Sequence, residues 1–396
     1  MRRLLGPVAV LAALLLVAAC GGGAGGASAG GSAEPLVIAF PVPLTSGNKA
    51  ASDEMVNTAQ LAVKSINESG GAGGRQLELR VYDDRLTADE SARIAQRALT
   101  QDGAEVIMGG YTSIEGLAIR EVTERRNVVY MATSTISPQL VQDATYTFRV
   151  AHDQGDYPVQ MAELYAQLGF RTPVVVHDDG PTGSTLFGPI GDALRANGLQ
   201  PAEPVAFSLN STDMSSAVAA VKATGPDSIV YIGSSGADAG LMLKTLAEQG
   251  VNLPVLGFGS LISAEALSIG GTAYDQTSVY TLANIQPSKP QWQEFVDLYA
   301  AEYGGDPEQL RTGLVEQTAQ TWDAFELLRQ ALDATGGDTE GDALVAALKS
   351  VPPFEGAAGR AGGFVSLVDS QTAYRQSLVA FELEGGKPVE AAVPAG

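Results

Sequence analysis

The amino-acid sequence predicts an α/β fold with two doubly wound parallel-sheet lobes. Three observations lead to this prediction. Short apolar runs alternate with longer helix-like segments almost to the end of the chain, and this alternation starts afresh after residue 150. The hydrophobic fraction of 45% is ordinary for a globular protein and excludes disorder as the main state.

The composition excludes several classes of function. The 396 residues include 24 Lys and Arg against 45 Asp and Glu, a formal charge of -21, which repels phosphate backbones and argues against nucleic-acid partners. The single cysteine cannot form an internal disulfide, an iron–sulfur cluster or a cysteine zinc site. The chain has two histidines, so we do not expect a histidine-rich metal site. No cofactor is expected either.

Residues 1–20 have the pattern of a secretory signal, with two arginines, an apolar stretch and small residues before Cys20. The apolar stretch is shorter than the roughly 20 residues that a membrane-spanning helix needs. Its end resembles the lipobox of bacterial lipoproteins, which implies an extracytoplasmic protein anchored to the cell membrane by lipid on Cys20. The alternative is a plain signal peptide with a chance cysteine. Residues 21–34 predict a flexible Gly-rich tether, and the remainder is long enough for two domains.

In the first part of the chain, apolar runs predict strands and amphipathic segments predict helices. The clearest helix has its apolar residues on one face, two acids in its first turn and a glycine pair after its end. Strands are predicted at Leu36–Val42, Leu77–Tyr82, Val106–Met108, Val128–Met131 and Phe148–Val150. Helices are predicted at Asp53–Ser69, Ala88–Gln101 and Ile114–Arg126.

After residue 150 the same alternation returns, which predicts a second sheet similar to the first. Strands are predicted at Val174–Val176, Val205–Phe207, Ile229–Ile232, Phe364–Leu367 and Leu378–Leu383. Helices are predicted at Met161–Leu168, Ala193–Ala196, Met214–Ala223, Gln291–Tyr303, Val315–Ala334 and Asp342–Lys349.

Polar loops follow several of the predicted strands, and such loops are where parallel α/β sheets bind small ligands. They are rich in hydroxyl groups and glycine, and a ligand between the two sheets would touch loops from both. The residues predicted to bind it are Tyr111, Ser113, Ser134 and Thr135 in the first sheet and Thr182, Ser234, Ser235 and Ser260 in the second.

Each candidate also has an interpretation without a ligand. Ser113 would cap a helix that begins at Ile114. Ser134 and Thr135 would bond to backbone groups of their loop, and the ring of Tyr111 would pack in the core. The four candidates in the second sheet rest on their placement alone.

The sequence offers little for catalysis. The run His177–Asp179 carries the imidazole and carboxylate groups of metal and acid–base sites, but no second histidine lies close to it, so we interpret it as a strand-end turn. The glycine runs 70–74 and 257–259 lack the features of phosphate loops, and the serine-hydrolase elbow is missing. We therefore expect a protein that is not an enzyme.

A set of short segments spread over residues 35–390 matches one known pattern. These segments are Pro43–Gly47, Ala62–Gly71, Gly74–Leu79, Tyr82–Asp84, Phe148–Arg149, Asp153–Gly155, Val174–Asp179, Gly225–Asp227 and Trp322–Ala324. They resemble the type I extracytoplasmic solute-binding lipoproteins of ABC importers, and the Leu/Ile/Val-binding group in particular. The resemblance implies two lobes joined by a three-crossing hinge, with an N-terminal lobe of residues 35–150 and 284–366 and a C-terminal lobe of residues 151–283 and 367–396.

The resemblance also implies ligand contacts. In amino-acid-binding members of the family, the positions that match Ser113 and Ser134 hold the ligand carboxylate. The threonine that usually helps to hold the ammonium group falls at Ile136, and the acid that usually pairs with it falls near Gly259–Ser260, with no Asp or Glu adjacent. The two usual aromatic positions fall at Thr182 and near Ala51.

These departures leave the ligand open, because a buried ammonium group without an anionic partner is unfavourable by several kcal/mol. Either Asp178 or Asp238 supplies the negative charge from elsewhere, or the ligand is a small carboxylate or amide that has no ammonium group.

The function that the resemblance implies is that of a monomeric substrate-binding lipoprotein. It captures a branched-chain amino acid, or a related small carboxylate or amide, and delivers it to the permease and ATPase subunits of an ABC importer. Two alternatives remain. One is a ligand-sensing module of the same fold, and the other is a secreted α/β hydrolase that uses His177 with Asp178 or Asp179.

Overall fold

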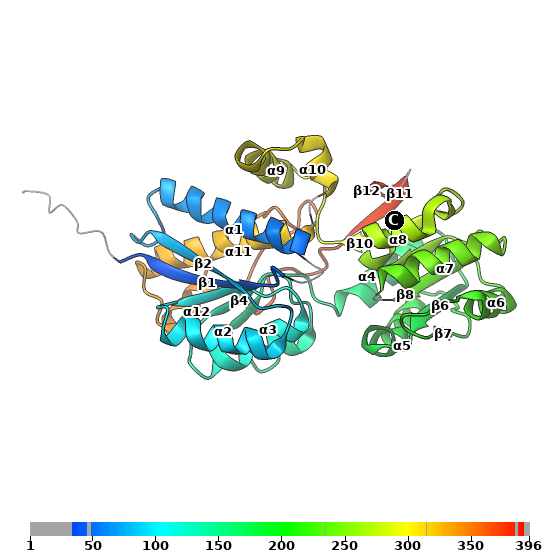
Figure 1. The fold of residues 1–396 in the computed structure, drawn as a ribbon, viewed down its shortest axis with the longest axis horizontal. Helices are drawn as coiled ribbons and strands as arrows, with labels where there is room; N and C mark the ends of the chain where they lie inside the picture. Colours follow the sequence, from blue (N-terminus) through cyan, green and yellow to red (C-terminus); the bar gives the residue numbers. More distant parts are fainter. Residues whose placement is uncertain (1–33, 46–48, 234, 314, 385–386, 392–396) are drawn as a thin grey trace, which may run out of the picture. The chain divides into compact units, whose positions relative to one another are not determined.

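Two sheets organise the chain (Figure 1). The computed structural model describes residues 34–391 except 46–48, 234, 314 and 385–386. Within these residues the first sheet is parallel and has the strand order β2-β1-β3-β4-β5. Its strands are β1 (Leu36–Val42), β2 (Leu77–Asp83), β3 (Val106–Gly109), β4 (Tyr130–Ala132) and β5 (Thr147–Arg149).

Strand β1 shows why the first sheet is buried on both faces. All of its residues are buried. The even-numbered side chains from Leu36 to Val42 join one hydrophobic cluster, whereas Val37 and Ala39 join another, because successive side chains of a strand point to opposite faces. Helices α1 (Lys49–Glu68) and α11 (Glu316–Thr335) contribute to the first cluster, and α2 (Ala88–Thr100) and α3 (Ser113–Glu124) to the second.

The second sheet has the order β12-β11-β10-β9-β8-β6-β7, and β11 and β12 run antiparallel at its edge. The other pairs are parallel, so the predicted α/β fold class is confirmed. The strands are β6 (Pro173–Asp178), β7 (Val205–Phe207), β8 (Ser228–Ile232), β9 (Val255–Gly257), β10 (Val279–Ala283), β11 (Val379–Glu384) and β12 (Lys387–Glu390). The helices are α4 (Asp156–Gln167), α5 (Pro181–Ala196), α6 (Ser215–Thr224), α7 (Gly236–Glu248) and α8 (Ala264–Gly270), with 3-10 turns η2 (Gly259–Ile262) and η3 (Gly271–Asp275).

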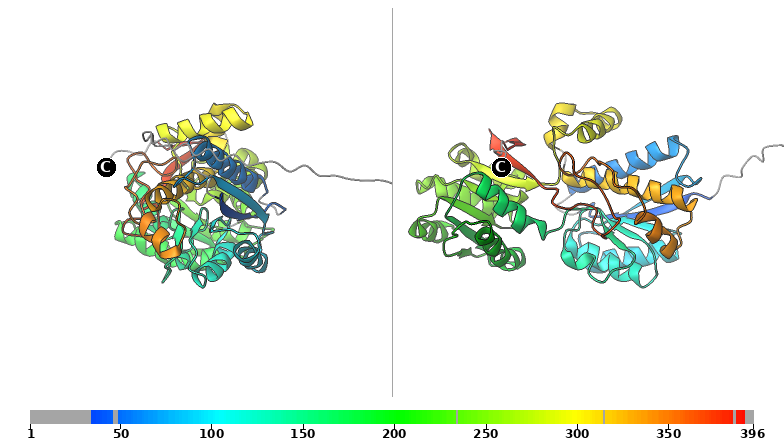
Figure 2. Two further views of the ribbon diagram at one scale, coloured as in Figure 1. Left: turned by 90° about the vertical axis from the view of Figure 1, so that its left-hand side faces the viewer. Right: turned by 180° about the vertical axis from the view of Figure 1, so that it is seen from behind.

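The segment after β10 packs on the first sheet, although it follows the second in the sequence (Figure 2). Trp292 and Phe295 are buried in the same cluster as β1, and α11 packs along α1. Near the end of the chain, Tyr374 still belongs to this cluster, whereas Leu378 belongs to a cluster of the second sheet. The helices of this segment, besides α11, are α9 (Pro290–Tyr303), α10 (Pro307–Gly313) and α12 (Gly341–Leu348).

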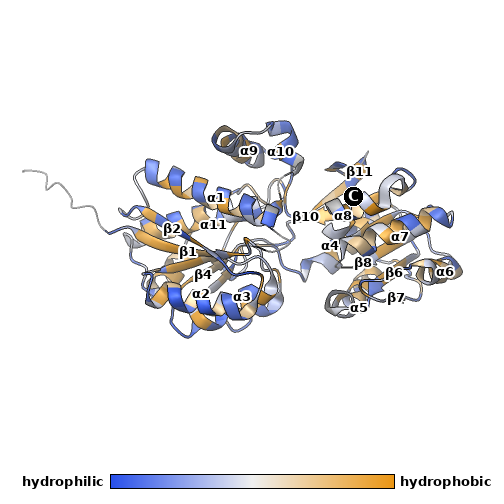
Figure 3. Ribbon diagram, viewed as in Figure 1, coloured by the Kyte–Doolittle hydropathy of each residue, from blue (hydrophilic) through white to orange (hydrophobic). Residues whose placement is uncertain are grey.

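Hydrophobic residues concentrate on the strands and on the helix faces that cover them (Figure 3). The glycine pair predicted to end the first helix does so, because Gly70 and Gly71 have φ values of 109° and 90°, which side chains disfavour. No helix in the described part of the chain is long and apolar enough to span a membrane. The predicted signal, the tether up to residue 33 and Cys20 lie outside the described residues.

Four predicted elements differ clearly from the structure. Helix α1 begins at Lys49 instead of Asp53, so its first turn contains no acid. The strand expected at Phe364–Leu367 is wrong, since this segment forms only one isolated bridge, from Val365 to Phe354, and Phe364 is exposed. Its apolar residues alternate because Val365 and Leu367 are buried in the first core. Helices α4 and α5 begin at Asp156 and Pro181, well before the apolar stretches that predicted them. Proline fits both starts, since it is tolerated in the first turn of a helix.

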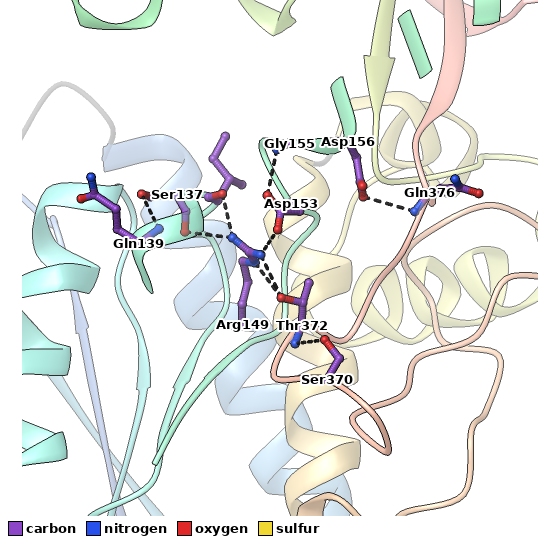
Figure 4. A network of polar contacts seen from close by, with 10 residues as sticks. Ser137, Gln139, Arg149, Asp153, Gly155, Asp156, Ser370, Thr372 and Gln376 are labelled. Atoms are coloured by element: carbon purple, nitrogen blue, oxygen red, sulfur yellow. Dashed lines mark hydrogen bonds and ion pairs between the residues drawn. The ribbon is translucent and has the colours of Figure 1, made fainter. Parts of the chain in front are cut away.

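A buried arginine joins two of the segments that run between the sheets (Figure 4). Arg149 ends β5 and is 1% exposed. Its guanidinium group donates to the carbonyls of Ile136 and Ser137, both at 2.9 Å, to the hydroxyl of Thr372 at 2.8 Å, and to the carboxylate of Asp153. The backbone of Arg149 also bonds to residues 371 and 373. The segment that leaves β5 is therefore fixed to the segment that leads into β11.

We expect Arg149→Met to lower the free energy of unfolding by about 3 kcal/mol, because it leaves buried acceptors and the Asp153 carboxylate without their donor. Urea unfolding followed by circular dichroism measures this change. The matched control is Arg125→Met, since Arg125 is 66% exposed in its ion pair with Glu121 and its loss should lower stability by less than about 1 kcal/mol. Equal effects of the two substitutions would contradict this role of Arg149.

Candidate functional site

The carboxyl ends of the parallel strands meet at one edge of each sheet. In the first sheet β1 lies between β2 and β3, and in the second β6 lies between β7 and β8, so the direction of winding reverses at these strands. Ligands of doubly wound sheets bind at such reversals, beside the amino ends of the helices that follow. The loops after β1, β3, β6 and β8 therefore form the candidate site, together with their neighbours after β4 and β9.

Two candidate hydroxyl groups fasten the loop after β4 to the loop after β3. The hydroxyl of Ser134 donates to the carbonyl of Tyr111 at 2.7 Å, and that of Thr135 donates to the carbonyl of Thr112 at 3.1 Å. Both side chains are buried. Their protons are thus used on backbone groups, as the interpretation without a ligand expected, and contact of these two hydroxyls with a ligand stays a prediction.

Ser113 is the first residue of α3, and the residue that caps this helix is Thr112. The expectation that Ser113 caps a helix beginning at Ile114 is therefore wrong. The Ser113 hydroxyl makes no hydrogen bond to another described residue. The backbone N–H groups at the start of α3 are available to an anion, and a hydroxyl group beside them suits the same ligand. Ser113 as a contact of a ligand carboxylate stays a prediction.

Tyr111 lies half-buried against the core of the first sheet. Burial raises the pKa of its hydroxyl, and the carboxylates of Glu316, Glu115 and Glu54 raise it further. Packing and ligand contact are both compatible with this position. The three carboxylates nevertheless make the surroundings of Tyr111 negative, a feature that the sequence did not predict.

In the second sheet, two of the candidate hydroxyl groups again form hydrogen bonds with backbone groups of the loops. Ser235 caps α7 and accepts a hydrogen bond from the Asp238 N–H at 3.2 Å. Ser260 donates to the carbonyl of Gly233, which ties the loop after β9 to the loop after β8. Thr182 lies in the first turn of α5, and Ser234 lies outside the described residues. These residues surround two further helix amino ends, and their contact with a ligand stays a prediction.

The acids that were considered as ammonium partners in the second sheet have structural roles. Asp178 is buried and accepts the N–H groups of Gly180 and Gly183, both at 3.0 Å, which shapes the turn into α5. Asp238 is also buried and accepts the Asn210 N–H at 2.8 Å. The ring of His177 stacks on Phe187 with centroids 4.4 Å apart. No group of three potential metal ligands occurs among the residues that the structure describes.

A carboxylate that the sequence analysis missed lies at the start of α11. Glu316 accepts the backbone N–H of Asn284, and its other oxygen is 3.7 Å from Nδ1 of His152. Glu54 of α1 lies beside it and accepts the Val315 N–H at 3.1 Å, while burial raises its pKa. Both act on Tyr111. The sequence shows Glu316 as an acid in the first turn of a predicted helix. That Glu316 lies near Tyr111 could not be predicted, because it depends on how the segment after β10 returns to the first sheet.

An apolar surface accompanies these polar groups. Ile136, where the related pattern has threonine, packs against a hydrophobic cluster of the second sheet. Phe258, in the loop that holds Ser260, belongs to the same surface and meets the ring of Tyr157 edge to face with centroids 4.6 Å apart. A hydrocarbon side chain of a ligand would make apolar contacts with Ile136 and Phe258.

A surface hollow of about 470 Å³ lies elsewhere, between the end of α1 and α11, and is lined among others by Ser65, Trp322 and Arg329. It lies at the carboxyl end of α1, away from the strand ends at which doubly wound sheets bind ligands. The strand ends therefore remain the candidate site.

Comparison with known proteins gives a consistent result. The profile of the family described as periplasmic binding protein matches residues 35–384. The Leu/Ile/Val-binding protein BraC3 of Rhizobium johnstonii is 24% identical over 358 residues, which cover 90% of this chain and 94% of the relative.

Two solved structures show the range of ligands among proteins of similar fold. The substrate-binding protein of an ABC transporter from Desulfitobacterium hafniense, in complex with Leu, has a TM-score of 0.74 at 22% identity and matches 91% of this chain and 100% of its own. A solute-binding protein of an ABC transporter from Rhodopseudomonas palustris, in complex with 3,4-dihydroxybenzoic acid, has a TM-score of 0.70 at 20% identity, with coverages of 90% and 95%.

Proposed function

Since this chain belongs to the periplasmic binding protein family, we propose that it is the lipid-anchored solute-binding component of an ABC importer. The observation that carries the proposal is the family match, which spans both sheets. Each sheet has an edge of strand ends beside helix amino ends with free N–H groups. A solute that bonds to both edges at once favours the closed arrangement of the lobes. The protein then acts by binding and release, without catalysis, and its partners are permease and ATPase subunits.

We propose two lobes between which the chain crosses three times, one of residues 35–150 with 284–374 and one of residues 151–283 with the end of the chain. The third crossing is placed between Tyr374 and Leu378 instead of at residue 367, because Leu367 and Tyr374 are buried in the core of the first sheet and Leu378 in a core of the second. The Arg149 contacts to Asp153 and Thr372 support a mechanical link between the first and last crossings. The contact of Glu316 with the Asn284 N–H lies at the second crossing. A hinge with such bonds on every crossing would restrict closure to one path.

The proposed solute is an aliphatic amino acid. Its carboxylate would bind the N–H groups at the start of α3 beside Ser113, and its ammonium group would face Glu316, Glu54 and Tyr111. The usual partners of the ammonium group are missing at Ile136 and near Gly259–Ser260. In this proposal, carboxylates of the first lobe provide the negative charge in their place. The second candidate is a small carboxylate without an ammonium group, which the apolar Ile136 favours.

We expect Glu316→Gln to weaken the binding of L-leucine by about 2 kcal/mol, roughly 30-fold, because the charge is lost while the glutamine oxygen still accepts the Asn284 N–H. Calorimetric titration of refolded, solute-free protein measures this, and 4-methylpentanoate, which lacks the ammonium group, should be unaffected by the substitution. Glu308→Gln serves as control, since Glu308 is 79% exposed. If the wild type binds 4-methylpentanoate and rejects leucine, the second candidate is correct.

We expect Cys20→Ala to move the protein from the membrane fraction to the soluble fraction of the cells that produce it, because the acyl chains have no other attachment point. Fractionation followed by immunoblotting measures the distribution, and labelled fatty acid should enter the wild type and not the variant. Retention of the variant in the membrane would show that lipid on Cys20 is not the anchor.

A further inference from the structure

Two carboxyl groups, of Asp84 and Glu115, lie fully buried beneath the loop that follows β3. Asp84 follows β2, and its Oδ1 atom accepts the Leu86 N–H at 3.1 Å. Glu115 lies in the first turn of α3, and its Oε2 atom accepts the Thr112 N–H at 2.6 Å and the Thr112 hydroxyl. Each group has one further oxygen, Asp84 Oδ2 and Glu115 Oε1, which is shielded from solvent and has no donor among the described residues.

The two groups are neighbours in one buried site, since the charge of Glu115 raises the pKa of Asp84 and both act on the buried hydroxyl of Tyr130. No basic side chain of the described residues pairs with either one. Two ionised carboxylates in such a site repel each other and leave both outer oxygens without a donor. A single proton between them removes one charge and provides the missing donor.

We propose that Asp84 and Glu115 share one proton, and that this proton positions the Thr112 loop for the ligand carboxylate. Asp84 carries the proton, because Oε2 of Glu115 already accepts two donors on Thr112, whereas Asp84 accepts a single backbone N–H. The two are positioning residues, since neither is placed in contact with the solute. The part of the inference that concerns binding rests on the proposed function, whereas the shared proton does not.

The surroundings of the pair support a neutral Asp84. Burial, followed by the charge of Glu115, raises the pKa of Asp84 to about 7, and Asp83 adds to the effect. The other titratable neighbours are Tyr130 of β4, whose pKa both acids raise, and Tyr111 of the loop, whose pKa Glu115 raises.

Basic side chains near the pair either lie in solvent, as the exposed Arg85 next to Asp84 does, or have other partners. On α2, which packs against α3, Arg93 pairs with Glu90 at the surface. On α3 itself, Arg120 donates to the carbonyl of Gln142. Neither arginine therefore neutralises the buried acids, and a proton remains the available means of doing so.

The connection from the pair to the site is short. Glu115 holds the Thr112 N–H, Thr112 caps α3, and the carbonyls of Thr112 and Tyr111 are held by Thr135 and Ser134. Ionisation of Asp84 would place a second negative charge beneath the helix end that receives the ligand carboxylate. Ligand binding and the retention of this proton therefore favour each other.

The sign of the pH effect follows from the two pKa values. Asp84 has an ordinary pKa of 3.8 and a folded-state pKa of about 7, so the folded protein binds the proton more tightly than the unfolded chain does. The stabilisation is complete below the ordinary value and is lost as the pH rises through about 7. The affinity for an anionic group at α3 falls over the upper part of the same range.

The test compares wild type, Asp84→Asn and Glu115→Gln at about pH 6 and about pH 8.5. Each amide supplies the donor permanently, and the glutamine oxygen can still accept the Thr112 N–H. In the wild type we expect the urea midpoint to fall with rising pH and L-leucine to bind about threefold to tenfold more weakly at the higher pH. Asp84→Asn should lose most of these differences, and Glu115→Gln should reduce them, because burial still raises the pKa of Asp84 in that variant. Glu121→Gln, at an exposed site of α3, should retain them.

A wild type without pH dependence of unfolding, or variants that retain the full dependence, would overturn the shared proton. If one variant fails to fold, the other still decides the question. If leucine binds to no form at either pH, the ligand of the proposed function is wrong, while the unfolding profiles still test the proton. If unfolding depends on pH in the expected way but leucine affinity does not, the proton exists and its role in positioning the loop is refuted.

Discussion

The structure depends on one constraint, which is that parallel strands covered by helices on both faces expose polar backbone groups only at their ends. In β1, successive side chains join two hydrophobic clusters in turn, and all of them are buried. Both faces of the first sheet are therefore packed against helices. At the carboxyl edges, the helices begin with N–H groups that have no partner inside the helix. Both sheets present such an edge, and this is why we propose that a polar solute binds there.

Most polar side chains near these edges hold loops in place, and few are left for a solute. Ser134, Thr135, Ser235 and Ser260 all bond to backbone groups of their own or neighbouring loops. A loop that is already fixed before binding reduces the entropic cost of binding, because the solute does not have to order it. The buried pair of Asp84 and Glu115 acts one layer deeper, under the same loop. On the crossing segments, Arg149 plays a comparable part with backbone and hydroxyl acceptors.

The sequence predicted the features that depend on local pattern. Apolar runs located β1 and β2, and the glycine pair located the end of α1, because burial and backbone conformation there are decided by adjacent residues. The strand at Phe364–Leu367 was wrong because alternating apolar residues also fit an irregular segment that lies on a core. Glu316 was missed because its place beside Tyr111 is set by a return of the chain over a long sequence separation. The pairing of Asp84 with Glu115 was not predicted, since the two residues are far apart in the sequence and meet only when α3 packs in the fold.

The central claim is that the solute carboxylate binds at the amino end of α3 while the same solute reaches the second lobe. Hydrogen–deuterium exchange of the solute-free protein, with and without L-leucine, tests it most directly. The account predicts slower exchange of the Ser113 and Ile114 amides and of the first turn of α7, with little change around Ser65 and Arg329. Protection confined to the hollow between α1 and α11, with unchanged exchange at Ser113, would contradict it.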